Sequence, residues 1–190
     1  MKKKTQFMVI VSAMVLLSLA LFSCATAPPS KSEKEQQQDS VREMANKTLS
    51  DHYTKHPAAK DAIAKAAGYA VFSDFGFKVM FMGGARGKGL AVNNASKQET
   101  FMEMAEFQPG MGLGAAKYRV VFIFETPDAF NSFVTSGWEV GANAMASAKT
   151  KTEGGALAGA VTVSKGVKML QLNGERAIVG VSITAAKYYK

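Results

Sequence analysis

The residue type best suited to chemistry in this chain is cysteine, and the chain has one, Cys24. It is the last residue of 21–24 (LFSC), at the end of an apolar stretch over 7–22 that follows three lysines. A basic start, an apolar middle and small residues at a cleavage point are the layout of a secretory signal. The last four residues fit the bacterial lipobox, in which the cysteine becomes the acylated N-terminus. We predict a signal peptide over 1–23 and lipid attachment at Cys24.

The apolar stretch of sixteen residues is shorter than the roughly 20 that span a bilayer, which favours a signal over a transmembrane anchor. A plain secretory signal with an incidental cysteine is the alternative. Two or more acyl chains hold a protein stably on a membrane, so the first predicted partner is the membrane itself. The residue after the cysteine is Ala25 and not Asp. In this the chain resembles lipoproteins that are sorted to the outer membrane, because an Asp at this position is typical of those kept at the inner membrane. The predicted location is therefore the bacterial cell envelope, at the outer membrane facing the periplasm.

Four cationic side chains are the candidate ligand-binding residues. The glycine-rich residues 83–89 (GGARGKG) look like a phosphate loop, but they lack the first glycine and the final Ser or Thr of a Walker A motif. We interpret them as a hairpin whose Arg86 and Lys88 hold an anionic head group beside exposed amides. Lys117 and Arg119 are assigned the same role. Ordinary solubilising charge is the alternative explanation for all four.

Metal binding and catalysis have little support. His52 and His56 are spaced i, i+4 like two zinc ligands, but Tyr53 stands where a metalloprotease has its glutamate. We read both histidines as solvated helix positions. The one thiol is predicted to be lipidated, and no G-x-S-x-G motif occurs. The chain is predicted to be no enzyme and to need no metal or cofactor.

Composition limits the classes of partner. About 167 of the 190 residues remain after the predicted cleavage, enough for one domain with a core. The formal charge of +8 falls to about +5 without the lysines of the signal. A modest basic excess suits an anionic lipid surface or a nucleic acid equally. The predicted compartment argues against nucleic acid.

The helices are expected in the first and middle parts of the chain. Residues 25–38 lack large apolar side chains and are predicted to form a flexible tether, with one domain over 39–190. A helix is predicted from an N-cap at residues 39–40 to His56, a second from Pro57 to a stop at Gly68. A third runs from Thr126 to Gly137.

The remaining pattern predicts short strands. These cover residues 69–72, 77–82, 89–92, 98–107, 118–125, 138–148, 161–164, 167–172 and 177–184. Asn173-Gly174 predicts a hairpin between the last two. The alternating Gly110, Gly112 and Gly114 indicate either a strongly curved sheet or a face laid against the second helix. The predicted fold class is α+β: a curved, mostly antiparallel, barrel- or sandwich-like sheet with a few short covering helices.

Three stretches resemble the SYLF domain family. They are residues 66–72 (AAGYAVF) with the glycine-rich segment after them, residues 112–115 (GLGA) leading into 120–124 (VVFIF) and the helix from Thr126, and residues 174–183 with Gly180-Val181-Ser182. Together they cover about three quarters of the mature chain. The resemblance implies a lipid-binding domain, and many bacterial members are secreted or lipid-anchored. For a bacterial chain the expected ligand is anionic phospholipid in general.

These observations predict a membrane-anchored, non-catalytic lipoprotein whose domain binds anionic phospholipid. The alternative is an envelope scaffold that binds a protein or the cell wall and uses lipid only as its anchor. An exposed apolar patch with a polar rim would favour that alternative. A hydrolase of envelope polymers is the third class, and a buried carboxylate pair in a cleft would favour it.

Overall fold

The computed structural model describes residues 30–190, apart from 108, 110, 141–159 and 181–184. Residues 38–190 form one compact unit, and the first residues of the first described helix belong to a second unit, Met1–Gln37. The helices are α2 (Lys31–Lys55), α3 (Ala58–Lys65) and α4 (Pro127–Ser136). The strands are β1 (Gly68–Met80), β2 (Met82–Asn93), β3 (Glu99–Phe107), β4 (Gly112–Phe124), β5 (Trp138–Val140), β6 (Ala160–Ser164), β7 (Val167–Gly180) and β8 (Ala185–Tyr189).

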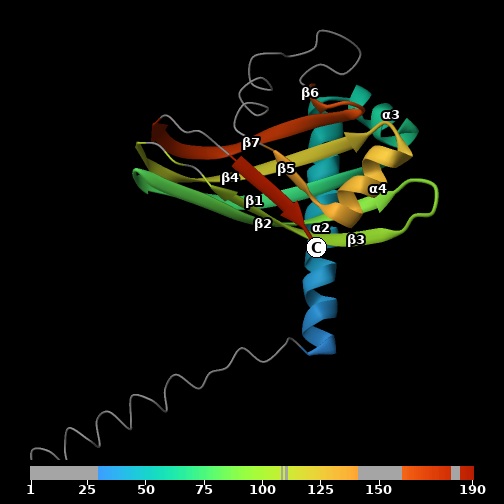
Figure 1. The fold of residues 1–190 in the computed structure, drawn as a ribbon, viewed down its shortest axis with the longest axis horizontal. Helices are drawn as coiled ribbons and strands as arrows, with labels where there is room; N and C mark the ends of the chain where they lie inside the picture. The colour runs from blue at the N-terminus through green and yellow to red at the C-terminus, as the bar shows by residue number, and fades with distance from the viewer. Residues whose placement is uncertain (1–29, 108, 110, 141–159, 181–184) are drawn as a thin grey trace, which may run out of the picture. The chain divides into compact units, whose positions relative to one another are not determined.

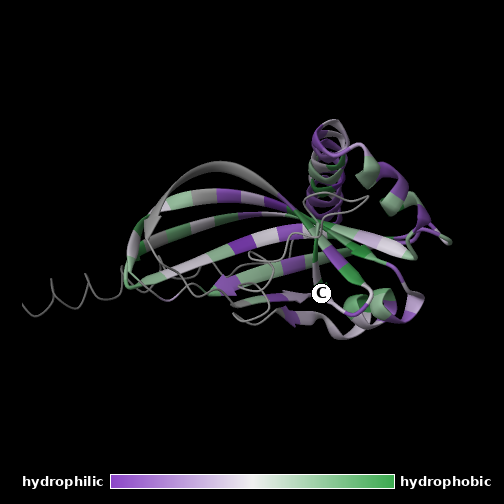
Figure 2. Cartoon of the chain, turned by 90° about the horizontal axis from the view of Figure 1, so that it is seen from above, coloured by the Kyte–Doolittle hydropathy of each residue, from purple (hydrophilic) through white to green (hydrophobic). Residues whose placement is uncertain are grey.

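All eight described strands join in one sheet, in the order β5-β8-β3-β2-β1-β4-β7-β6. Each neighbouring pair runs antiparallel. The long central strands bend together, so the sheet is curved (Figures 1 and 2). This confirms the predicted α+β class with a curved antiparallel sheet and few helices.

Helix α2 begins eight residues before the predicted N-cap at residues 39–40. The Ser30 hydroxyl accepts a hydrogen bond from the Glu33 amide at 3.2 Å, and the Glu33 carboxylate accepts one from the Ser30 amide at 2.6 Å. This reciprocal pair is a capping box, and the Lys, Glu and Gln residues that follow are good helix formers. The predicted flexible tether is therefore wrong for residues 31–38, while 25–29 lie outside the described residues.

Two hydrophobic clusters hold the sheet from its two faces. Helix α2 buries Val41, Ala45 and Leu49 in one cluster, against Val71 and Val121 of the sheet. The opposite cluster packs the aromatic rings of Phe72, Phe122, Phe124, Phe130, Phe133 and Tyr188. Their centroids lie 4.8 to 6.5 Å apart with several edge-to-face contacts, the arrangement that aromatic quadrupoles favour.

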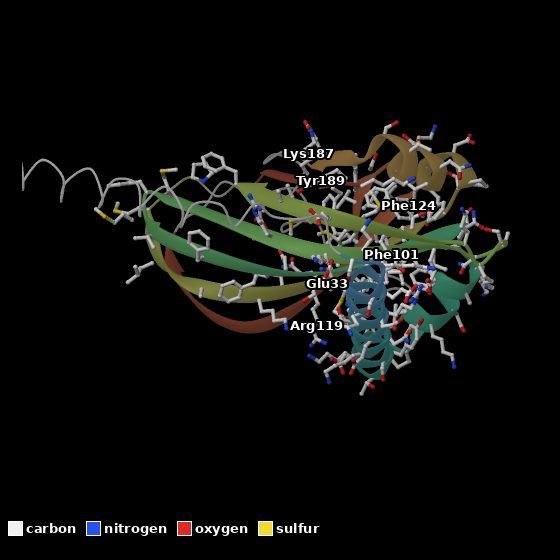
Figure 3. The ribbon with its side chains drawn as sticks, turned by 90° about the horizontal axis from the view of Figure 1, so that it is seen from below. Glu33, Phe101, Arg119, Phe124, Lys187 and Tyr189 are labelled. Atoms are coloured by element: carbon white, nitrogen blue, oxygen red, sulfur yellow. The ribbon has the colours of Figure 1, made fainter. Side chains whose placement is uncertain are left out.

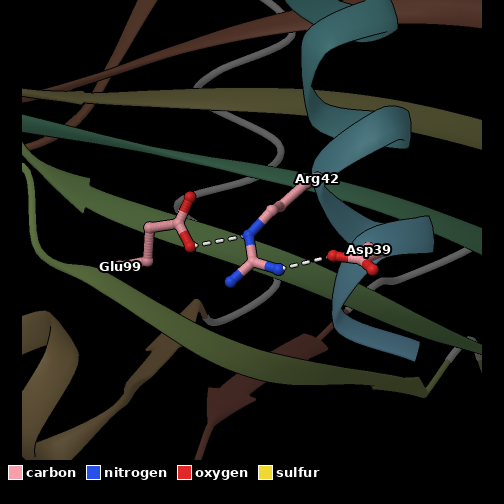
Figure 4. A network of polar contacts seen from close by, with 3 residues as sticks. All are labelled: Asp39, Arg42 and Glu99. Carbon is pink, nitrogen blue, oxygen red and sulfur yellow. Dashed lines mark hydrogen bonds and ion pairs between the residues drawn. The ribbon is translucent and has the colours of Figure 1, made fainter. Parts of the chain in front are cut away.

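Polar contacts fix the helices to strand ends. Arg42 on α2 donates from Nε to Glu99 of β3 at 2.8 Å and from Nη1 to Asp39 at 2.7 Å (Figure 4). Its guanidinium also lies 5.0 Å from the centroid of the Phe101 ring. Asn94, in the turn after β2, donates to the Ile63 and Ala66 carbonyls at the end of α3 at 2.7 and 2.9 Å.

Helix α4 forms as predicted. Thr126 is its N-cap, and the Thr126 hydroxyl accepts from the Ala129 amide at 3.3 Å. Pro127 opens the helix, and Gly137 ends it at a φ of 71°, in the left-handed region that favours glycine.

The glycine-rich segment is not a hairpin loop, because residues 83–89 are part of strand β2. The turn lies at Phe81, so residues 69–72 and 77–82, predicted as two strands, fall mostly in the single strand β1. Glycine is needed in β2 because atoms of the neighbouring strand β1 occupy the space that a side chain would need. A Cβ at Gly89 would lie 2.2 Å from Cδ1 of Phe72, and one at Gly87 would lie 2.7 Å from the Ser73 carbonyl oxygen.

The predicted hairpin at Asn173-Gly174 is also wrong, because β7 runs unbroken through it. The register between β4 and β7 shifts there, from Tyr118 opposite Asn173 to Ala116 opposite Arg176. The Asn-Gly pair thus falls at a β-bulge, which needs the same backbone freedom as a turn. Gly112 and Gly114 lie in β4 at the end opposite to α3, which leaves sheet curvature as their explanation.

Among the described residues, no helix combines the length and the hydropathy that a membrane crossing requires.

Candidate functional site

The four predicted cationic residues lie on one face of the sheet, the face that α2 partly covers. In the antiparallel register, Phe75 on β1 stands between Arg86 on β2 and Lys117 on β4. Residues directly opposite one another point to the same face, so the two cations flank one exposed aromatic ring. Arg86 and Lys117 are both exposed.

Two residues earlier on β1, nearer to α2, a cation again lies on each neighbouring strand. Ser73 stands between Lys88 and Arg119. The guanidinium of Arg119 pairs with Asp51 of α2, and its side chain is only 23% exposed, whereas Arg86, Lys88 and Lys117 are exposed. Figure 3 shows Arg119 beside α2, at the boundary where the helix stops covering the sheet. We assign Arg119 to holding α2 on the sheet, with a smaller part in any ligand contact.

The other three cations surround a shallow hollow of about 410 Å³, named here the basic hollow. It is lined by Ser73, Asp74, Phe75, Arg86, Gly87, Lys88, Glu103, Met104, Lys117 and Tyr189. Glu103 is the exposed carboxylate among these residues. With three cations against one exposed acid, the hollow attracts an anion of head-group size. The aromatic rings of Phe75 and Tyr189 add apolar surface to it.

Asp74 is the buried acid at this site. It follows Ser73 on β1 and is 6% exposed, and its Oδ1 has no hydrogen-bond partner within the described residues. Burial, reinforced by the negative charge of Glu106, raises the pKa of the Asp74 carboxyl to about 7. Near neutral pH this carboxyl is therefore partly protonated. Because side chains alternate along a strand, Asp74 points to the face opposite to that of Ser73, Phe75 and the cations.

Tyr188 lies in the core next to these acids. It is 3% exposed, and burial raises the pKa of its hydroxyl strongly, with the charges of Asp74 and Glu106 acting in the same direction. The phenol therefore stays neutral. Asp74 is buried but Glu106 is only partly buried, so these two acids are not a fully buried carboxylate pair.

The two histidines differ in environment. His52 is fully buried on α2, and neither ring nitrogen has a hydrogen-bond partner within the described residues. Burial first, then the neighbouring charges of His56 and Arg119, lowers the pKa of His52 to about 4. The prediction that both histidines are solvated is therefore wrong for His52, which behaves as a neutral core residue. The described residues contain no cluster of three or more His, Cys, Asp or Glu placed to hold a metal ion.

Beyond the basic hollow, the same sheet ends in exposed apolar side chains. Among the described residues, nine large apolar side chains are more than half exposed: Phe75, Phe77, Val79, Met80, Phe81, Met82, Phe107, Met111 and Leu113. All nine lie where β1 and β3 end and β2 and β4 begin, and we call this set the apolar end. Figures 2 and 3 show the strands running on past α2 toward it.

Sequence reasoning found the cations but missed the apolar end. The sequence predicts strands over 77–82 and 98–107, but period and composition do not say which end of a strand a helix covers. One signal was available: neither residues 75–92 nor 107–124 contain an Asp or Glu. The predicted acylation site Cys24 lies outside the described residues.

The chain is similar to a curated protein of known name. The chain is 29% identical over 155 residues to "Beta cell expansion factor A" of Aeromonas veronii. The match covers 78% of this chain and 55% of that protein, so the chain spans about half the length of the curated relative it matches. No family model matches the chain. The relative's name states neither a ligand nor a reaction.

Proposed function

We propose that this chain is a lipid-anchored, non-enzymatic protein of the bacterial envelope whose folded domain binds anionic phospholipid. The observation that carries the proposal is the convergence of Arg86, Lys88 and Lys117 on the basic hollow. These cations come from two strands that are separated in sequence and joined by β1. Scattered solubilising charge would not require such convergence, whereas recognition of a phosphate-bearing head group does.

The proposed attachment at Cys24 strengthens even a weak head-group contact. A domain tethered to the bilayer meets its ligand at a high effective concentration, so modest affinity suffices. The sequence resemblance to the SYLF domain family supports the same ligand class. The proposed location is the outer membrane, facing the periplasm.

The second candidate is an envelope scaffold that binds a protein partner. The specific observation in its favour is the apolar end, since a large exposed apolar patch on a soluble domain marks an interaction surface. Its surroundings are compatible with both candidates. The patch continues into a cationic surface, which is complementary to an anionic membrane as well as to an acidic protein.

Vesicle flotation of residues 25–190 separates these functions, because this chain contains every described residue and lacks the proposed lipid. We expect it to float with vesicles of phosphatidylcholine and phosphatidylglycerol, and to favour them over pure phosphatidylcholine by roughly 100-fold, since each of the three cations at the hollow adds about 1 kcal/mol, or roughly fivefold. Raising the salt from about 50 to 500 mM should weaken binding steeply. A chain that ignores anionic vesicles at low salt would instead support the scaffold.

A further inference from the structure

The apolar end is large enough to need a partner in solution. Nine exposed side chains, four of them phenylalanine rings, gather at one end of the sheet, while the described helices cover other parts of it. Folded domains seldom leave such a contiguous patch open to water unless it meets another surface. The charges around the patch indicate which class of partner covers it.

The charges around the apolar end favour an anionic partner. The two segments that build it, 75–92 and 107–124, contain five cations and no acid: Lys78, Arg86, Lys88, Lys117 and Arg119. A second copy of the chain would bring these cations toward one another across the contact, which is unfavourable. A surface that combines an apolar interior with anionic groups matches both features, and a bilayer with anionic lipids is such a surface.

The spacing along β1 fits the layers of a bilayer. Phe75, level with Arg86 and Lys117, precedes Val79 by four residues, which is about 13 Å along a strand. Interfacial elements sink about 5 to 10 Å past the head groups. If the side chains around Val79 reach that depth, the two cations lie at the level of the lipid phosphates, and their long side chains can extend to meet them.

Insertion leaves the main chain hydrogen-bonded. Strand β1 pairs with β2 as far as Val79 opposite Met82, and with β4 as far as Met80 opposite Gly112. Strand β1 is therefore paired on both sides almost to the turn. A shallow contact with hydrocarbon then avoids the large cost of unpaired polar groups.

We propose that the apolar end inserts into the interfacial layer of an anionic bilayer and sets the domain's orientation, with the β1–β2 turn lowest and the basic hollow at the head groups. The proposal rests on the proposed lipid-binding function and adds a docking surface and an insertion depth to it. Phe77, Phe81 and Met82 enter the acyl region in this arrangement.

A single-tryptophan depth measurement tests it. In residues 25–190 carrying Trp138→Phe, Phe81→Trp places the probe at the turn, and Ala95→Trp places a control probe in the exposed turn at the other end of β2. With phosphatidylglycerol vesicles containing lipids brominated along the acyl chain, we expect the Phe81→Trp emission to shift to the blue and to lose more than half its intensity. The Ala95→Trp emission should stay unchanged.

Binding by flotation without quenching of the Phe81→Trp probe would overturn insertion while leaving the proposed function standing. Failure to bind vesicles at all would overturn both. A blue shift that grows with protein concentration in the absence of vesicles would mean that a second copy covers the patch, which also overturns insertion.

A second variant leaves the tryptophan in place. Phe81→Ser with Met82→Ser removes two exposed apolar groups, so folding should be unaffected. We expect vesicle affinity to fall by about tenfold with the salt dependence unchanged, because apolar contact is lost and charge is not. Unchanged affinity in this folded variant would contradict insertion.

Discussion

Reversing the charge of Arg86 and Lys117 together should abolish most binding to anionic vesicles, with a loss of roughly 100-fold or more at low salt. Both side chains are exposed and flank Phe75, so glutamates there replace two attractive charges with two repulsive ones beside the basic hollow. The affinity should be measured by flotation at several salt concentrations. Loss should be greatest at low salt and should shrink as ions screen the surface.

The matched control is Lys60→Glu with Lys165→Glu, which changes the net charge equally. Lys60 is exposed on α3 and Lys165 in the turn between β6 and β7, both toward the end of the sheet away from the apolar end. If net charge alone drives binding, the two double variants will lose affinity equally. A recognition site at the hollow requires that the control retain most of its affinity.

The second large effect concerns stability. Asp74→Asn should stabilise the fold by about 4 kcal/mol above pH 7 and leave it unchanged below about pH 4. The reason is that burial, reinforced by the negative charge of Glu106, raises the pKa of the Asp74 carboxyl from 3.8 to about 7. Asparagine keeps the shape and cannot carry the charge.

The direction of this pH dependence follows from proton binding. Between pH 3.8 and about 7 the folded state holds a proton on Asp74 that the unfolded chain releases. The free energy of unfolding therefore falls as pH rises through that window, and the cost is complete above it. Urea unfolding at pH 4 and pH 8 measures it, with Asp61→Asn on the exposed face of α3 as control. An equal effect of Asp74→Asn at both pH values would contradict the assignment.

Local signals predicted the elements that local chemistry determines. Thr126, Pro127 and Gly137 fix both ends of α4 through caps, and those residues are visible in the sequence. The central strand around Val120–Phe124 was equally evident, because its β-branched and aromatic residues form an unbroken run.

Long-range packing decided what the sequence misread. Glycine usually ends a strand, yet Gly87 and Gly89 belong inside β2 because their missing side chains make room for Asp74 and Phe72. Asn173-Gly174 serves a bulge instead of a turn, since β4 continues alongside it. His52 is buried because α2 places it against the sheet, and the i, i+4 spacing alone does not reveal which face of a helix is covered.

The same distinction applies to the candidate site. Arg86, Lys88, Lys117 and Arg119 could be named from their positions near glycine-rich strands, but their common face depends on β1 lying between β2 and β4. Asp51 lies 68 residues before its partner Arg119, so no local pattern predicts that ion pair. The apolar end likewise required knowing where α2 stops covering the sheet.

The central claim, that the basic hollow binds the lipid head group, is tested most directly by amide chemical shifts. Soluble short-chain phosphatidylglycerol should be titrated into isotopically labelled residues 25–190 below its micelle concentration. We expect saturable shifts centred on Arg86, Gly87, Lys88 and Lys117, with the turn at residues 94–97 unaffected. Shifts confined to another surface, or none at concentrations that saturate vesicle binding, would contradict it.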